Sequence, residues 1–242
     1  MKKTKKHSSM MAIIAALILS MMFFACGDDG GGDDGNGTSW TAVADSTFGA
    51  NHIYGVAYGN GRWVAGGVSG KMATSTDGTN WTAVTDSTFS TLDYIGGVAY
   101  ANGIWVAVGT YGKMATSSNA TSWTAVGTST FGDSSIRGVA YGNGIWVAVG
   151  YDGKMATSSN GTSWTAVGTS TFGSDHIYGV AYGNGRWVAG GDSGKMATSS
   201  NGTSWTAVVD STFGANGIYG VAYGNGIWVA VGNYGRMAYN VD

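Results

Sequence analysis

The chain has 242 residues, of which 43% are hydrophobic, 11% are charged and none is proline, so it can bury a sizeable core while carrying little charge. Glycine occurs 43 times, whereas Glu and Gln do not occur at all. The formal net charge of −2 lacks the basic excess of nucleic-acid binding proteins, so no nucleic-acid partner is expected.

The first 25 residues are organised like an export signal. Four lysines between residues 2 and 6 precede an uncharged run over residues 10–25, which at 16 residues is shorter than the roughly 20 that a spanning helix needs. The only cysteine, Cys26, follows Phe23-Phe24-Ala25. This placement resembles the lipobox of bacterial lipoproteins, in which the Cys is acylated and becomes the mature N-terminus. The alternative is an ordinary secretory signal with an incidental cysteine.

Residues 26–37 form a second segment, rich in glycine and aspartate, which cannot bury apolar surface and is expected to be a solvated tether. Without residues 1–25 the chain keeps four Lys and four Arg against 14 Asp, a net charge of −6. The predicted organisation is therefore a signal peptide (1–25), a tether (26–37) and a folded domain (38–242). Membrane anchoring through a lipid on Cys26 predicts an exported protein of the outer membrane or cell surface.

The folded part is an internal repeat. Tryptophans of an S-W-T-A-V-like segment recur every 41 or 42 residues, at Trp40, Trp81, Trp123, Trp164 and Trp205. One period reads I-x-G-V-A-Y, turn, W-V-A, turn, K-M-A-T-S, turn and S-W-T-A-V, followed by a longer loop. Each segment has the length and the Val, Ile, Trp and Tyr content of a short strand.

Asn-Gly pairs such as Asn60-Gly61 separate the first two segments of most periods and predict tight antiparallel hairpins. Each period therefore forms a four-stranded sheet that is apolar on both faces, and radial stacking of such sheets gives a five-bladed β-propeller. We expect the strand Ser39–Val43 to complete the last sheet and close the ring. An open β-solenoid is the rival fold, but its coils are parallel.

The turn Ser75-Thr76-Asp77-Gly78-Thr79-Asn80-Trp81 resembles the Asp-box of sialidase-like (BNR) repeats, S-x-D-x-G-x-x-W, with one residue fewer. Asn119, Asn160 and Asn201 replace the aspartate in the next three copies. In that family the box is a structural turn between the third and fourth strands, away from the ligand site. The resemblance thus implies the fold and little chemistry.

Two loop classes differ between otherwise similar repeats: the long loop before the first strand, and the loop between the second and third strands. In a four-stranded meander both loop classes emerge at the same end of the sheet, and therefore on one face of the propeller. Loops on a rigid scaffold are where binding residues usually lie. Aromatic rings beside carboxylates suit sugars, and the candidate ligand-binding residues are Tyr94, Tyr111, Tyr151, Tyr234, Asp93, Asp152, Asp192 and Arg137. Alternatively, the tyrosines only cover the sheet ends and the aspartates cap turns.

Arg137 directly follows the first isoleucine of its repeat, and the residues at this position along the repeats are Tyr54, Gly96, Arg137, Tyr178 and Tyr219. Because the inner strands of a propeller line its central channel, this position is expected to shape the mouth of the channel. His52 and His176 are equivalent in repeats one and four; two histidines make a poor zinc site, so surface histidines and no metal are expected.

A binding protein is predicted rather than an enzyme. The sialidase machinery of an arginine cluster and a Tyr/Glu pair is missing, because the chain has no Glu. The architecture resembles five-bladed propeller lectins, whose repeated sites bind glycans multivalently. We therefore expect a monomeric module that binds glycans without catalytic residues or a cofactor. A protein-interaction or structural surface lipoprotein is the alternative.

Overall fold

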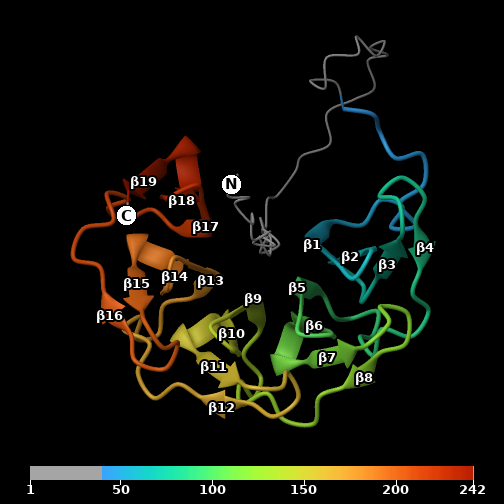
Figure 1. Cartoon of the computed structure of the whole chain (residues 1–242), viewed down its shortest axis with the longest axis horizontal. Coiled ribbons are helices and arrows are strands. Elements are labelled where there is room, and N and C mark those ends of the chain that lie inside the picture. Colours follow the sequence, from blue (N-terminus) through green and yellow to red (C-terminus); the bar gives the residue numbers. More distant parts are fainter. Residues whose placement is uncertain (1–39, 242) are drawn as a thin grey trace, which may run out of the picture.

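The computed structural model describes residues 40–241, and within them each repeat forms a four-stranded antiparallel sheet, except the last, which has three strands. We call these sheets blades 1 to 5 in chain order. They are arranged around a common centre with the first strand of each blade innermost (Figure 1). The predicted all-β fold of five antiparallel sheets is confirmed, and it is that of a β-propeller. The predictions for residues 1–25 and 26–37, including Cys26, lie outside the described residues.

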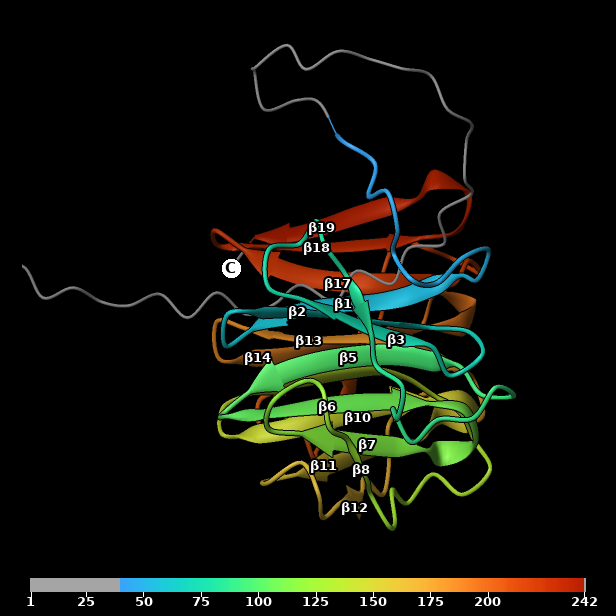
Figure 2. The same ribbon diagram turned by 90° about the vertical axis from the view of Figure 1, so that its right-hand side faces the viewer.

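The strands follow the repeat in order from the centre outward, and a side view shows the blades stacked face to face (Figure 2). The innermost strands are β1 (Ile53–Gly59), β5 (Ile95–Ala101), β9 (Ile136–Gly142), β13 (Ile177–Gly183) and β17 (Ile218–Gly224). The second strands are β2 (Arg62–Gly67), β6 (Ile104–Gly109), β10 (Ile145–Gly150), β14 (Arg186–Gly191) and β18 (Ile227–Gly232). The third strands are β3 (Met72–Ser75), β7 (Met114–Ser117), β11 (Met155–Ser158), β15 (Met196–Ser199) and β19 (Met237–Val241). The outer strands are β4 (Thr82–Ala83), β8 (Thr124–Ala125), β12 (Thr165–Ala166) and β16 (Thr206–Ala207).

The first hairpin of every blade closes through Asn-Gly, as predicted. The asparagines have φ between 44° and 51°, and the following glycines have φ between 72° and 81°. Two consecutive residues with positive φ match the right-handed twist of the flanking strands, which is why Asn-Gly is favoured here. The asparagines are Asn60, Asn102, Asn143, Asn184 and Asn225.

The turn before the outer strand is held by its own side chains. In blade 1 the Asp77 carboxylate accepts hydrogen bonds from the Asn80 side chain (2.8 Å) and backbone (2.7 Å) and from the Ser75 hydroxyl (3.0 Å). These bonds, led by that from the Asn80 side chain, hold the pKa of Asp77 well below its usual value. The indole of Trp81 donates to the Gly78 carbonyl (3.0 Å). Asn119, Asn160 and Asn201 cap the same turn in blades 2 to 4, so this position is structural.

The outer strands are two residues long, shorter than the predicted S-W-T-A-V segment. The reason is that the tryptophan packs inward instead of extending the strand. Trp123, for example, is buried in a cluster that includes Val64 and Met72 of the preceding blade. Trp164 and Trp205 are buried against the equivalent valines and methionines of blades 2 and 3.

Neighbouring blades also interlock near the centre through a tyrosine that lies on a glycine. A Cβ added to Gly59 would lie 2.2 Å from the ring of Tyr100, and one added to Gly142 would lie 2.2 Å from the ring of Tyr182. Glycine at the end of the inner strand therefore lets the tyrosine of the next blade pack closely in blades 1 and 3, whereas blade 2 has Ala101 at this position.

The predicted closure of the ring is not present in the structure. Residues 40–43 form no strand, Trp40 is 99% exposed, and blade 5 keeps β19 as an uncovered outer edge. The facing surfaces of blades 1 and 5 are uncovered as well: none of the described residues lies within 4 Å of a Cβ added to Gly224 in blade 5, and Tyr58 of blade 1, which would pack on it, is 48% exposed. The ring has an opening between blades 5 and 1 (Figure 1). The described N-terminal segment lies on the blade 1 side of this opening, where it leads into β1, and so it does not reach β19.

A cavity marks the place of the missing outer strand. Its volume is about 340 Å³, and its lining includes Val188, Met196, Trp228 and Tyr239 of blades 4 and 5. Val188 and Met196 are equivalent to Val147 and Met155 of blade 3, which share a buried cluster with Trp205 one interface earlier. The cavity therefore lies where a tryptophan of the outer strand packs in the other blades.

Candidate binding site

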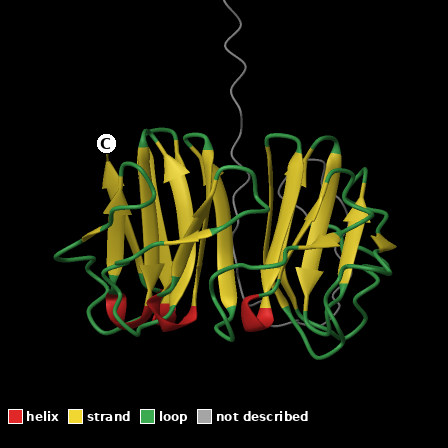
Figure 3. Cartoon of the chain, turned by 90° about the horizontal axis from the view of Figure 1, so that it is seen from below, coloured by secondary structure: helices red, strands yellow, loops and turns green. Residues whose placement is uncertain are grey.

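The two variable loop classes lie at the same end of the blades. The loop between the second and third strands forms a 3-10 turn in blades 2 to 5, and Figure 3 shows these turns at the end opposite to the Asn-Gly hairpins. A backbone hydrogen bond ties each turn to the end of the long loop, as from Tyr151 N to Ser135 O (2.9 Å) and from Asp192 N to His176 O (2.9 Å). The 3-10 turns are η1 (Thr110–Gly112), η2 (Tyr151–Gly153), η3 (Asp192–Gly194) and η4 (Asn233–Gly235).

The three predicted turn tyrosines are not equivalent. Tyr111 and Tyr234 occupy the second turn position, with φ of 51° and 55°, and their side chains are 61% and 90% exposed. Tyr151 occupies the first position, and its ring packs against His176. The structure therefore brings Tyr151 to the centre with Tyr94 and Arg137, and leaves Tyr111 and Tyr234 at the loop tips.

Aromatic side chains at this end form a connected series across the blades, which we call the aromatic arc. On its first side, the rings of His52 and Tyr54 are stacked with centroids 6.3 Å apart, and Tyr54 meets Tyr94 edge-on at 5.7 Å. The arc consists of His52, Tyr54, Tyr94, Tyr151, His176, Tyr178 and Tyr219.

On its second side the arc runs through blades 3, 4 and 5. Tyr151 stacks on His176 with centroids 3.9 Å apart and planes at 18°. His176 meets Tyr178 edge-on at 6.3 Å, and Tyr178 meets Tyr219 edge-on at 5.1 Å. Such contacts fix the rings relative to one another.

Arg137 joins the two sides. Its Cζ atom lies 5.7 Å from the ring centre of Tyr54, 5.2 Å from that of Tyr94 and 5.8 Å from that of Tyr151, within the range of cation–π contacts. The equivalent position in blade 2 is Gly96, where a Cβ would lie 2.8 Å from the backbone oxygen of Ile136. Because blade 2 has no side chain there, Arg137 can reach Tyr54 two blades away.

The acidic groups of the arc are engaged in hydrogen bonds. Asp192 accepts from the Tyr178 hydroxyl (2.8 Å) and from the backbone N–H of His176 (3.2 Å). Asp152 accepts from the Ser134 hydroxyl (2.7 Å), and its own N–H donates to His176 Nδ1 (3.2 Å). With Nδ1 as an acceptor, neutral His176 carries its proton on Nε2.

The tyrosine hydroxyls remain protonated at neutral pH. Burial, and then the hydrogen bond donated to Asp192, raise the pKa of Tyr178. Burial also raises the pKa of Tyr151; the Arg137 charge acts in the opposite direction without reversing the shift. The Tyr178 hydroxyl therefore keeps donating its proton to Asp192 at neutral pH, and its oxygen remains able to accept a hydrogen bond.

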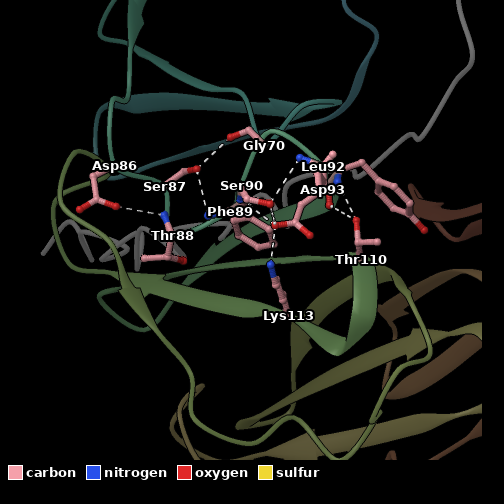
Figure 4. Close-up of polar contacts among 11 residues, drawn as sticks. Gly70, Asp86, Ser87, Thr88, Phe89, Ser90, Leu92, Asp93, Thr110 and Lys113 are labelled. Atoms are coloured by element: carbon pink, nitrogen blue, oxygen red, sulfur yellow. Dashed lines mark hydrogen bonds and ion pairs between the residues drawn. The ribbon is translucent and has the colours of Figure 1, made fainter.

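Asp93, also predicted as a ligand residue, lies inside its own loop (Figure 4). Its side chain is almost fully buried, forms an ion pair with Lys113 (2.5 Å) and accepts from the backbone N–H (2.6 Å) and hydroxyl (2.8 Å) of Ser90. In blades 1, 3 and 4 the lysine equivalent to Lys113 donates to a phenylalanine carbonyl, and in blade 4 it also forms an ion pair with Asp175. Asp93 thus supports the long loop of blade 2 rather than facing a ligand.

Replacing Asp93 with alanine is expected to lower the free energy of unfolding at pH 7 by about 1 to 3 kcal/mol, because three hydrogen bonds to a buried carboxylate are lost. Burial alone would raise the pKa of Asp93, but the bonds from Lys113 and Ser90 outweigh it and lower the pKa below 3.8. The carboxylate therefore stabilises the fold above pH 3.8, and this contribution is lost as the pH falls through the lowered pKa.

Urea unfolding of both proteins at several pH values measures this difference, which should shrink below pH 3.8. The exposed Asp133, in the same loop of blade 3, provides the control Asp133→Ala, for which no comparable loss is expected. A difference that stays constant into acid would show that the Asp93 charge does not support the loop.

Within residues 40–241, no group of three His, Cys, Asp or Glu side chains lies close enough together to hold a metal ion. In the same range no helix is long and apolar enough to cross a membrane. What the arrangement provides is a surface of aromatic faces with hydroxyl, carboxylate and guanidinium groups between them.

Sequence reasoning found part of this site. It selected Tyr94, Tyr151 and Arg137, together with Asp152 and Asp192. It described Tyr54, Tyr178 and Tyr219 only as shaping the channel mouth, and it treated His52 and His176 as surface residues. The missed signal was the aromatic residue directly after the first isoleucine of the inner strand in repeats one, four and five.

Comparison with known families and structures supports the fold. A family model described as a DUF6242 β-propeller domain matches residues 85–234. No curated protein sequence matches this chain. YCF48 bound to D1 peptide superposes with a TM-score of 0.65 at 18% identity, over 85% of this chain and 69% of YCF48.

Two further structures share the fold. The computationally designed protein Ika8 gives a TM-score of 0.60 at 14% identity, over 79% of this chain. The GH74 enzyme of Niastella koreensis gives 0.52 at 17% identity, over 80% of this chain. This chain spans 58% of Ika8 and 35% of the GH74 enzyme, so it matches only a part of either protein.

Proposed function

This chain belongs to the family of DUF6242 β-propeller domains, and on this scaffold we propose a binding function in which a glycan lies on the aromatic arc. The observation that carries the proposal is the pair of ring series, each fixed by contacts of 3.9 to 6.3 Å and joined by Arg137, at the end of the blades where the loops vary. A sugar offers an apolar face to such rings and hydroxyl groups to the polar atoms between them.

The proposed binding mode differs from the repeated, equivalent sites expected from the sequence. The rings of the arc come from different loop and strand positions in successive blades, and blades 2 and 3 contribute no ring at the position of Tyr54 because Gly96 and Arg137 stand there. One asymmetric site at the channel mouth therefore fits the geometry better than five similar sites.

A non-catalytic role is part of the proposal. The carboxylates of Asp152 and Asp192 are held by hydroxyl and N–H donors, and neither is paired with a second carboxylate in the described contacts. Glycoside hydrolysis in most families needs two such groups on either side of the scissile bond. The shared fold of the GH74 enzyme makes hydrolysis worth assaying, and release of reducing ends from a bound glycan would contradict this part of the proposal.

The proposed function is tested by a glycan array probed with the full chain. Retention of oligosaccharides that free sugar competes away is the expected result. Retention that no sugar competes would instead favour a protein or peptide ligand. YCF48, which has been determined with a bound peptide, shows that such a ligand is compatible with the fold.

We also propose that the domain is exported and held on a membrane by a lipid at Cys26. Buried acyl chains contribute about 0.8 kcal/mol per methylene, so two or more chains would hold the protein on a bilayer essentially permanently. Cys26→Ser is expected to abolish labelling by radioactive palmitate and to move the protein from the membrane fraction to the soluble fraction. Labelling that persists in this variant would place the lipid elsewhere, and an unchanged protein that takes up no label would show that the segment is an ordinary secretory signal.

A further inference from the structure

The charge of Arg137 has no acidic partner in the part of the chain that the structure describes. The ion pairs there join Lys113 to Asp93 and Lys195 to Asp175. Arginine stays protonated under all ordinary conditions, so a half-buried positive charge lies at the centre of the aromatic arc, beside the rings and hydroxyls of Tyr54, Tyr94 and Tyr151. A positive charge without an acidic partner favours the binding of a ligand that carries a negative charge.

The Arg137 guanidinium lies beside a buried tyrosine hydroxyl. Burial by itself lowers the pKa of the guanidinium, but the neighbouring oxygens of Tyr94, Tyr151 and Tyr54 outweigh it and raise the pKa. The Tyr94 hydroxyl is buried and makes no hydrogen bond of normal geometry with the described residues. The guanidinium therefore has tyrosine oxygens beside it but no anionic acceptor among the described residues.

We propose that the glycan held by the aromatic arc carries a carboxylate, as uronic acids do, and that Arg137 binds this group. This inference rests on the proposed function of the arc. The planar guanidinium can donate two parallel hydrogen bonds to a carboxylate, and the flanking rings of Tyr54, Tyr94 and Tyr151 offer the sugar faces on which to pack.

The first test changes the ligand and leaves the protein intact. Oligosaccharides of galacturonic acid and their methyl esters have the same sugar rings but differ in charge. Binding of the full chain, measured by calorimetry, is expected to weaken at least about tenfold on esterification, since hydrogen bonds to a charged group are the strong ones. Equal affinity for acid and ester would overturn the inference.

The second test changes the protein. Arg137→Gln keeps a hydrogen-bonding side chain of similar reach without the charge, and it is expected to remove the preference for the acid over the ester. Arg137→Lys keeps the charge but not the planar pair of donors, and it should retain an intermediate preference. The matched control is Arg62→Gln, which removes the same charge beside the Asn60-Gly61 turn at the other end of blade 1 and should leave the preference unchanged. An undiminished preference in Arg137→Gln would overturn the inference.

The outcomes separate this inference from the function on which it rests. If acid and ester bind equally and the array still shows sugar-competed retention, the arc binds glycans but Arg137 does not select a carboxylate. If no sugar binds and an oligoglutamate peptide binds in its place, the carboxylate site serves a peptide and the proposal of an acidic glycan is wrong.

Discussion

Trp123→Ala is expected to lower the free energy of unfolding by about 3 to 5 kcal/mol, whereas the same change at Trp40 is expected to leave it almost unchanged. Trp123 is buried between blades 1 and 2 and donates its indole N–H to the Ala120 carbonyl (3.2 Å). Trp40 stands in an equivalent sequence segment but is 99% exposed. Thermal or urea unfolding of the two variants makes the comparison.

This pair of variants also tests whether the ring is open. If Trp40→Ala destabilises the protein as much as Trp123→Ala does, Trp40 must be buried in solution. The cavity of about 340 Å³ lined by Val188 and Met196 would then be its site, and the N-terminal segment would complete blade 5. That result would contradict the three-stranded last blade described above.

The double variant Tyr151→Ala with Tyr178→Ala is expected to weaken glycan binding by roughly fivefold to a hundredfold. Each ring contact of this kind is worth about 0.5 to 1.5 kcal/mol, and 1.4 kcal/mol corresponds to a factor of ten in affinity. Both rings lie in the aromatic arc, on either side of His176. The dissociation constant is measured by calorimetry with an oligosaccharide that the array identifies, and the melting temperature shows whether each variant remains folded.

The matched control replaces Tyr111 and Tyr234, which lie at the loop tips outside the arc and are mostly exposed. Binding by this double variant is expected to equal that of the unchanged protein. If the control loses binding while the variant of Tyr151 and Tyr178 keeps it, the ligand lies on the repeated loop tips and binds multivalently, as the sequence alone suggested.

The fold could be predicted largely because the local signals agree with one another. The period of 41 or 42 residues, the Asn-Gly turns and the apolar segments all indicate the same four-stranded unit, and the φ values of Asn60 and Gly61 show the turn that this pair favours. Ring closure has no comparable local signal. The segment around Trp40 reads like every outer strand, but whether it pairs depends on how the blades at the two ends meet, which no short stretch encodes.

The site was harder to predict because it depends on single positions within the turns. Tyr111 and Tyr234 directly precede a glycine of the turn, whereas Tyr151 stands two residues before the equivalent Gly153. Treating the three tyrosines as one class concealed that difference. Counting from the glycine would have separated them, but the stacking of Tyr151 on His176 of the next blade is a contact between repeats that only the assembled fold creates.

The most direct test of the central claim is to locate the bound ligand in a crystal structure of the full chain with an oligosaccharide that the array identifies. We predict one sugar chain at the channel mouth, with a sugar ring packed on Tyr151 or Tyr178 and a polar group of the ligand at Arg137. An oligosaccharide bound at Tyr111 or Tyr234, with the aromatic arc left uncovered, would contradict the account.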